Sequence, residues 1–166
     1  MYRKVIDTKS DVFVANADGS NEHALTSAGT DGAAVWSHNG RKIAFTSMRD
    51  GNLEIYTMRA DGSGQQRLTT DPLNDVNPRW SPDDKQILFQ SARLGGFPQW
   101  RLFVMNADGS DQRPIGVEGG RDMFPEWSPK GDRIVFSSYR DGASKSDLYI
   151  MNADGSSLRR LIQTKP

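Results

Sequence analysis

Recurring pairs of cationic and anionic residues are the first feature of this sequence that could do chemistry. Three arginines each follow a strand-like run in a Ser-x-Arg context, and three aspartates each lie five residues before a tryptophan. Guanidinium and carboxylate groups form strong paired hydrogen bonds, so we expect each arginine to reach an aspartate of a neighbouring loop. The same cations could instead bind an anionic partner, but their recurrence favours the structural role. The arginines are Arg49, Arg93 and Arg140, and the aspartates are Asp31, Asp75 and Asp122.

Residues typical of catalysis are scarce. The chain has no cysteine, and its two histidines, His23 and His38, lie in a predicted outer strand and a predicted turn. No nucleophile elbow, zinc-binding helix motif or glycine-rich phosphate loop occurs. The segment from Asn106 to Asp111 resembles a calcium loop only superficially, because its glycine is misplaced and the distant glutamate is missing. We therefore expect a protein that is not an enzyme and has no cofactor or metal site.

One aromatic segment departs from an otherwise regular pattern. Trp36, Trp80 and Trp127 recur in step and are expected to pack inside the fold. Trp100 has no counterpart, and it lies in a loop that is longer than the equivalent loop at residues 50–53. Irregular loops on a regular scaffold often carry function, so Phe97 and Trp100 could anchor a partner. The alternative is an insertion that folds onto its own sheet, and the sequence does not decide between them.

These residues are ordered by an internal repeat. The tetrapeptide Ala-Asp-Gly-Ser begins at residues 17, 60, 107 and 153, and a Trp-Ser pair recurs between the copies. Regular self-similarity at this period is the signature of repeat folds. We expect one domain spanning 1–166, with repeats at 1–26, 27–70, 71–116 and 117–166.

Within each repeat the pattern predicts strands. Short runs rich in Ile, Val, Phe and Tyr are bounded by Asp-Gly and Asn-Gly turns, which are typical of hairpins. Two strands per repeat are apolar on successive residues, as expected for a sheet buried on both faces. The sequence therefore predicts an all-β fold, a β-propeller of four-stranded antiparallel blades. The first repeat lacks a Trp-Ser strand, so we expect the first blade to lack its inner strand.

The repeat resembles the TolB-type (WD40-like) β-propeller repeat family. The resemblance rests on Trp80-Ser-Pro-Asp83, Ser47-Met-Arg-Asp-Gly51 and Tyr149–Ser156, and it covers essentially the whole chain. It implies a periplasmic or otherwise extracytoplasmic scaffold that binds a protein or peptide through the loops between strands d and a and between strands b and c. The alternative is a fragment of the propeller of a prolyl-oligopeptidase-type peptidase or of a carbohydrate-active enzyme.

Charge and hydropathy limit the partners. The chain has 21 basic and 21 acidic residues, which argues against nucleic acid as a partner. No apolar run is long enough to cross a membrane, and no signal peptide is evident. Blades with two apolar faces predict uncovered faces at both ends of an open array. These faces could be covered in a homodimer that completes a larger ring, in a tight four-bladed ring, or in a longer propeller.

The candidate residues fall into two groups. Those expected to build the repeat are Asp31, Trp36, Arg49, Asp75, Trp80, Asp122 and Trp127. Those expected to contact a partner are Arg93, Phe97, Trp100, Arg101, Arg121, Arg140 and Lys145.

Overall fold

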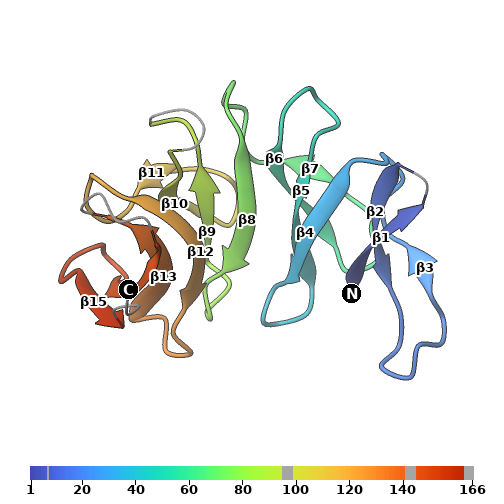
Figure 1. Ribbon diagram of the computed structural model, residues 1–166. Helices are drawn as coiled ribbons and strands as arrows, with labels where there is room; N and C mark the ends of the chain where they lie inside the picture. Colours follow the sequence, from blue (N-terminus) through green and yellow to red (C-terminus); the bar gives the residue numbers. More distant parts are fainter. Residues whose placement is uncertain (7, 95–98, 141–144, 163–166) are drawn as a thin grey trace. The chain divides into compact units, whose positions relative to one another are not determined.

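The computed structural model describes residues 1–6, 8–94, 99–140 and 145–162 (Figure 1). Fifteen strands occur in these ranges, and none of the residues described there is helical. The chain divides into two compact units, Met1–Pro78 and Arg79–Pro166. Each unit is built from antiparallel sheets in which strands that follow one another along the chain are neighbours.

The first unit contains a three-stranded and a four-stranded sheet, which we call blades 1 and 2. Among the described residues blade 1 has three strands and no inner strand, in agreement with the prediction. Blade 1 consists of β1 (Tyr2–Ile6), β2 (Lys9–Val14) and β3 (His23–Ala24). Blade 2 consists of β4 (Asp31–Trp36), β5 (Lys42–Ser47), β6 (Glu54–Arg59) and β7 (Gln66–Arg67).

Two further four-stranded sheets complete the chain as blades 3 and 4. The predicted fold class is confirmed, with each complete blade running from an inner strand a to an outer strand d. Blade 3 consists of β8 (Asp75–Trp80), β9 (Gln86–Ser91), β10 (Arg101–Asn106) and β11 (Arg113–Pro114). Blade 4 consists of β12 (Arg121–Trp127), β13 (Arg133–Tyr139), β14 (Asp147–Asn152) and β15 (Arg159–Ile162).

The Ala-Asp-Gly-Ser segments form the turns between strands c and d. Each glycine has a positive φ, between 83° and 90°, which a residue without Cβ adopts at little cost. In each turn the aspartate carboxylate accepts a hydrogen bond from the backbone N–H of the serine, at 2.9 Å. The turns therefore satisfy their own polar groups. The glycines are Gly19, Gly62, Gly109 and Gly155.

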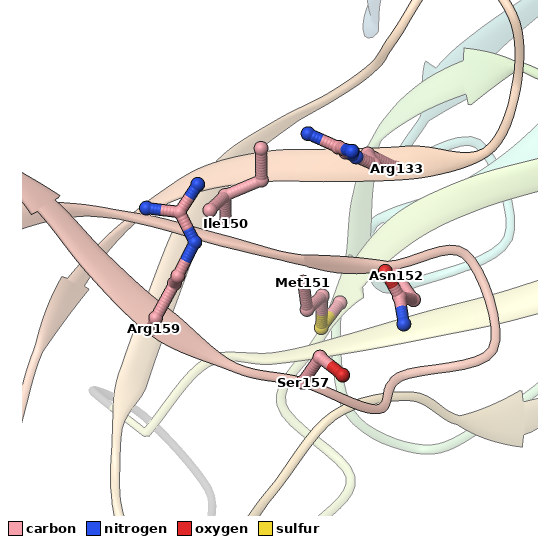
Figure 2. A pocket seen from close by; sticks show the side chains of 6 residues that line it. All are labelled: Arg133, Ile150, Met151, Asn152, Ser157 and Arg159. Carbon is pink, nitrogen blue, oxygen red and sulfur yellow. The ribbon is translucent and has the colours of Figure 1, made fainter.

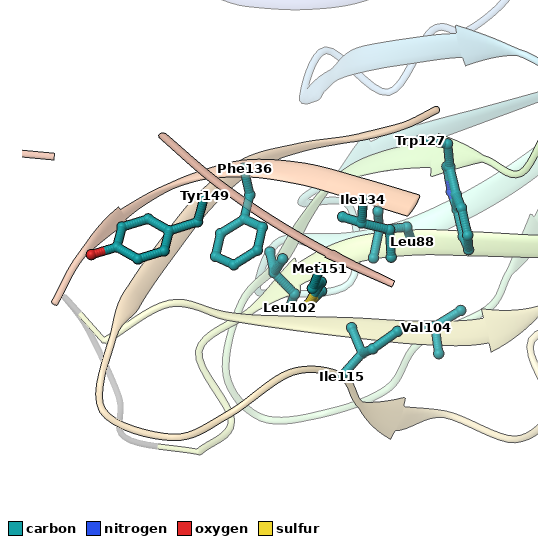
Figure 3. Close-up of a cluster of buried hydrophobic side chains, with 9 residues drawn as sticks. All are labelled: Leu88, Leu102, Val104, Ile115, Trp127, Ile134, Phe136, Tyr149 and Met151. Atoms are coloured by element: carbon teal, nitrogen blue, oxygen red, sulfur yellow. The ribbon is translucent and has the colours of Figure 1, made fainter. Parts of the chain in front are cut away.

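The apolar core lies between sheet faces within each unit. Strands β5, β6, β9 and β10 are buried over nearly their whole length, so their successive apolar residues face packed surroundings on both sides. Figure 3 shows the cluster in the second unit, where Phe136 and Tyr149 of blade 4 pack near Leu88 and Leu102 of blade 3. In β13 and β14, by contrast, buried and half-buried residues alternate. One face of blade 4 is therefore less covered, and its coverage by a second copy stays a prediction.

The recurring tryptophans do not share one environment. Trp80 and Trp127 are buried, as expected, but Trp36 is 37% exposed, so its predicted packing role is wrong. Trp127 Nε1 donates to the carbonyl of Arg79 in the inner strand of the preceding blade, at 3.4 Å. In the described residues the blade that precedes Trp36 has no inner strand to pack against it, in contrast to the blade that precedes Trp127.

Candidate binding rim

The loops that join strands b to c and d to a lie at the same end of each blade, because neighbouring strands are antiparallel. We call this end the loop rim and the opposite end, with its a–b and c–d turns, the hairpin end. In the first unit the described residues of the loop rim are 8, 25–30, 48–53 and 68–74. In the second unit its described residues are 92–94, 99–100, 115–120, 140 and 145–146.

Two of the predicted arginine–aspartate pairs are present on this rim. Arg140 Nη2 donates to both carboxylate oxygens of Asp122, at 2.9 and 2.8 Å, and both side chains are buried. Arg49 Nη2 pairs with Asp31 Oδ2 at 2.9 Å. Burial raises the pKa of Asp122, whereas the hydrogen bond from Ser138 and the Arg140 charge act in the opposite direction. These pairs fix the start of strand a to the loop that follows strand b.

The middle arginine has other described partners. Arg93 donates to Ser91 Oγ at 3.0 Å and to Gln112 Oε1 at 3.0 Å, and its guanidinium lies 4.8 Å from the ring centroid of Phe103. The predicted pairing of Arg93 with Asp75 stays a prediction.

Blade 2 carries a polar network on its rim. Arg67 Nη2 pairs with the fully buried Glu54 at 3.0 Å, and its Nη1 lies 3.6 Å from Asp50. Thr69 donates to Glu54, and the Tyr56 hydroxyl donates to Asp50. Burial, with the hydrogen bond to Asp50, raises the pKa of Tyr56 to about 12. Strands c and d are thereby joined by charge-assisted hydrogen bonds.

Blade 4 repeats part of this network. Arg160 Nε lies 3.3 Å from Asp147 and donates to the Tyr149 hydroxyl at 3.1 Å. The strand registers place Asp147 and Glu54 at equivalent positions, as well as Arg160 and Arg67. The pairing of a carboxylate on strand c with an arginine on strand d is therefore a property of the repeat.

Blade 3 has none of these side chains at the equivalent positions. Its registers place Arg101 where blade 2 has Glu54, and Phe103 where blade 2 has Tyr56. Pro114 occupies the position of Arg67, and Gly116 that of Thr69. Leu94 follows Arg93 as Asp50 follows Arg49. Every polar member of the blade 2 network is replaced.

Arg101 is left enclosed without a partner. The side chain is only 9% exposed, and its Nε is buried with no hydrogen-bond partner. Among the residues that the structure describes, Arg101 has no hydrogen bond or ion pair. Its charge acts on Asp122, whose carboxylate already pairs with Arg140, so Arg101 has no hydrogen-bonded counter-ion of its own. A buried guanidinium in this situation is unfavourable.

Exposed apolar side chains also distinguish the two ends of the blades. Met48 and Leu73 on the rim of the first unit, and Leu94 and Val117 on the rim of the second, are each 39–49% exposed. The described hairpin-end turns contain no large exposed apolar side chain, although Trp36 directly precedes one of them. The loop rim therefore presents the apolar surface that binding sites use.

Phe124, on the inner strand of blade 4, was not among the predicted candidates. It is 64% exposed and has φ 53°, a left-handed conformation that is unfavourable for a bulky residue. Its backbone N–H donates to Gln90 Oε1 at 3.0 Å. The equivalent residues of the other blades are Ala33 and Asn77, which also have positive φ. A bulky phenylalanine at this position, two residues after the repeated aspartate, was the feature of the sequence that could have identified Phe124 as a candidate.

The remaining predicted candidates have separate environments. Arg121 lies 4.9 Å from the ring centroid of Tyr139, and its Nε is buried without a partner. Trp100 is half-buried, and its carbonyl accepts the Asp122 N–H at 2.8 Å. Lys145 is exposed, and Phe97 lies outside the described residues. The structure thus brings Trp100 close to the Asp122–Arg140 pair.

Two hollows have linings that do not include Arg101. A cavity of about 490 Å³ in the first unit is lined by Asp31 of β4, Thr46 of β5 and the rim residue Met48, among others. A smaller hollow of about 180 Å³ lies beside β14, where Arg133 and Arg159 flank Ile150 (Figure 2). No cluster of three potential metal ligands occurs in the described ranges, and no helix there could span a membrane.

Comparisons with known proteins agree with this architecture. The family model of the TolB beta propeller domain matches residues 1–166. The Tol-Pal system protein TolB of Geobacter sulfurreducens is 41% identical over 71 residues, which are 43% of this chain and 16% of that protein. Dipeptidyl-peptidase 5 of Porphyromonas endodontalis is 31% identical over 83 residues, which are 49% of this chain and 12% of that protein. The matched segments are thus about a sixth or less of these relatives' lengths.

A solved TolB-type structure from Agrobacterium tumefaciens extends the similarity to the blades themselves. It superposes with a TM-score of 0.86 at 27% identity, covering 96% of this chain and 59% of that one. The repeat, the registers of the blades and the full-length family match lead to one conclusion. The chain belongs to the TolB β-propeller family.

Proposed function

We propose that this chain is a non-catalytic propeller scaffold that binds a protein or peptide through its loop rim. The observation that carries the proposal is the exposure of Met48, Leu73, Leu94 and Val117 at this end of the blades. Exposed apolar side chains on the rim of each unit are typical of interaction surfaces. Phe124 adds a large aromatic group of the kind that anchors partners.

The hairpin end supports the assignment by contrast. Its Asp-Gly-Ser turns are closed by aspartate–serine hydrogen bonds, which leave few unsatisfied groups for a partner. The two histidines do not support catalysis, because both are exposed and His23 Nδ1 contacts the carbonyl of Asn21. A loop rim with apolar groups and buried cations suits recognition of an extended segment.

A selection with random peptides tests the proposal. Twelve-residue peptides displayed on phage are selected against the whole chain, and enriched peptides are synthesised for affinity measurement by fluorescence anisotropy. We expect Leu94→Asp and Val117→Asp to weaken binding by about tenfold or more, because each places a charge in an apolar contact. Lys85→Ser, at the exposed hairpin end, is the matched control and should leave the affinity unchanged.

Phe124→Asn separates binding from folding. Asparagine tolerates the left-handed backbone, as Asn77 does at φ 55°, so this variant should be more stable by about 1 kcal/mol. We expect it nevertheless to bind the selected peptides more weakly. Peptides that depend on hairpin-end residues, or a failure to enrich any binding peptide, would contradict the proposed function.

The family similarity supports a location outside the cytoplasm, since relatives belong to the Tol-Pal system, and cell fractionation tests it.

A second candidate function is the propeller of a peptidase, which the similarity to dipeptidyl-peptidase 5 favours. The discriminating observation is whether the gene continues into an α/β-hydrolase sequence, in which case the peptidase interpretation takes precedence.

A further inference from the structure

We infer that Arg101 is the receptor for a carboxylate carried by an acidic side chain of the bound segment. This inference rests on the proposed function and assigns the chemistry of one position on the rim. It comes from the comparison of the same position in three blades.

The replacements in blade 3 are coordinated. In blade 2 the positions of Asp50, Glu54 and Arg67 hold two carboxylates and one guanidinium, which pair with one another. In blade 3 these positions hold Leu94, Arg101 and Pro114, so a single guanidinium remains. The sign of the charge on strand c is reversed, and its partner on strand d is removed.

The nearby carboxylate does not complete the pair. Both oxygens of Asp122 accept from Arg140, and Oδ1 also accepts from Ser138 at 2.5 Å. Burial raises the pKa of Asp122, and Arg101 is among the positive charges that oppose this effect, so the two side chains are near each other. Two enclosed guanidinium groups thus share one carboxylate that is already hydrogen-bonded to Arg140.

The surroundings of Arg101 favour a carboxylate over a more highly charged anion. Leu94, Phe103 and Pro114 replace the polar network, which leaves a less polar environment in which an ion pair is stronger than in water. A planar carboxylate matches the fork of one guanidinium and carries one negative charge. A phosphate dianion would require a second cation, and Arg93 already donates to Ser91 and Gln112.

Gly116 removes the threonine hydroxyl from this position. It has φ 91° and stands where Thr69 of blade 2 carries the hydroxyl that donates to Glu54. A Cβ at Gly116 would lie 3.2 Å from Met151 Sδ, so Met151 fills this space and no hydroxyl of the chain takes the place that Thr69 has beside Glu54. Arg101 retains 9% of its surface, so it is enclosed but not sealed from solvent.

The direct test observes the guanidinium itself. The Nε–H resonance of Arg101 in a ¹⁵N-labelled chain is assigned with Arg101→Lys and followed during titration with N-acetylglutamate N-methylamide. The isosteric N-acetylglutamine N-methylamide is the control ligand, and exposed Arg113 is the control residue. We expect a saturable shift of the Arg101 resonance with the glutamate probe alone.

A second test uses the selected peptides. We expect enriched sequences to contain Glu or Asp beside an apolar residue, and Glu→Gln or Asp→Asn in the peptide to weaken binding about tenfold. Arg101→Met should cause a similar loss and remove the difference between the two peptides, whereas Arg113→Met should do neither.

The outcomes separate the two proposals. If peptides bind through Leu94 and Val117 but neither Arg101 nor the peptide carboxylate matters, this inference is overturned and the proposed function stands. If no peptide binds the rim but Arg101 responds to the glutamate probe, the proposed function fails while the carboxylate site is supported. An Arg101 resonance that ignores the glutamate probe, or responds equally to the glutamine probe, overturns the inference.

Discussion

Blades 2 and 3 share one repeat but use their rims differently. In blade 2 Glu54, Arg67, Thr69, Asp50 and Tyr56 bond to one another across strands c and d. In blade 3 the equivalent side chains are one unpaired guanidinium, three apolar groups and a glycine.

The difference does not extend to the sheet itself. Strands β5, β6, β9 and β10 have nearly the same burial, and the aromatic pairs Phe45–Tyr56 and Phe89–Phe103 have ring centroids 5.6 and 5.7 Å apart. The repeat therefore fixes the apolar frame of a blade, whereas the rim can be exchanged without altering that frame. A blade can consequently differ in role from its neighbours through its rim residues alone.

The inner-strand tryptophans give the largest expected difference between these blades. Trp80→Ala should lower the free energy of unfolding by about 3–5 kcal/mol, because Trp80 is 3% exposed and its loss opens a cavity. Trp36→Ala should cost about 1–2 kcal/mol, because Trp36 is already 37% exposed. Urea denaturation followed by circular dichroism measures both. Equal losses would show that Trp36 is packed in solution and would remove this contrast.

The rim arginines give the next largest difference. Arg67→Met leaves the buried carboxylate of Glu54 without its ion-pair partner and should cost about 2–3 kcal/mol, since Arg67 is partly screened by solvent. Arg101→Met removes an unpaired buried charge and should be neutral or stabilising by about 1 kcal/mol. The same denaturation measurement applies. A large loss in Arg101→Met would mean that Arg101 stabilises the fold, which would weaken its assignment as a receptor.

The smallest difference concerns alkaline stability. Burial and the hydrogen bond to Asp50 favour the neutral hydroxyl of Tyr56 and raise its folded-state pKa from the ordinary 10.0 to about 12. The resulting stability is fully present below pH 10 and is lost as the pH rises towards 12. Tyr56→Phe should remove this part of the pH dependence, measured as unfolding free energy between pH 9 and 12. In blade 3 the equivalent residue is Phe103, which has no hydroxyl and therefore adds nothing to the change of unfolding free energy with pH. An unchanged slope in Tyr56→Phe would refute the assignment.

Several features of the fold could be read from residue types alone. Glycine in each Ala-Asp-Gly-Ser segment predicted left-handed turns, and apolar residues in succession predicted strands buried on both faces. The arginine–aspartate pairs of Arg140 and Arg49 followed from their fixed distance from the strands. These predictions succeeded because they depend on local backbone preference and on a spacing that repeats.

Other features could not be predicted from one repeat at a time. The exposure of Trp36 depends on the neighbouring blade, which lacks the strand that would cover it. The left-handed backbone of Phe124 lies at an irregularity in the pairing of β12 with β13, which recurs near Ala33 in the pairing of β4 with β5 and depends on the partner strand.

The sequence by itself determined the repeat, the strands and their turns, because apolar runs and turn residues act over a few positions. Only the tertiary structure decided which side chains are enclosed and which are paired, because burial and hydrogen bonding join residues from different strands. Arg101 illustrates the difference. The sequence placed it among the residues expected to contact a partner. The registers of β10 with β9 and β11 revealed that it stands where blade 2 has the buried carboxylate of Glu54, and that Pro114 stands where blade 2 has Arg67.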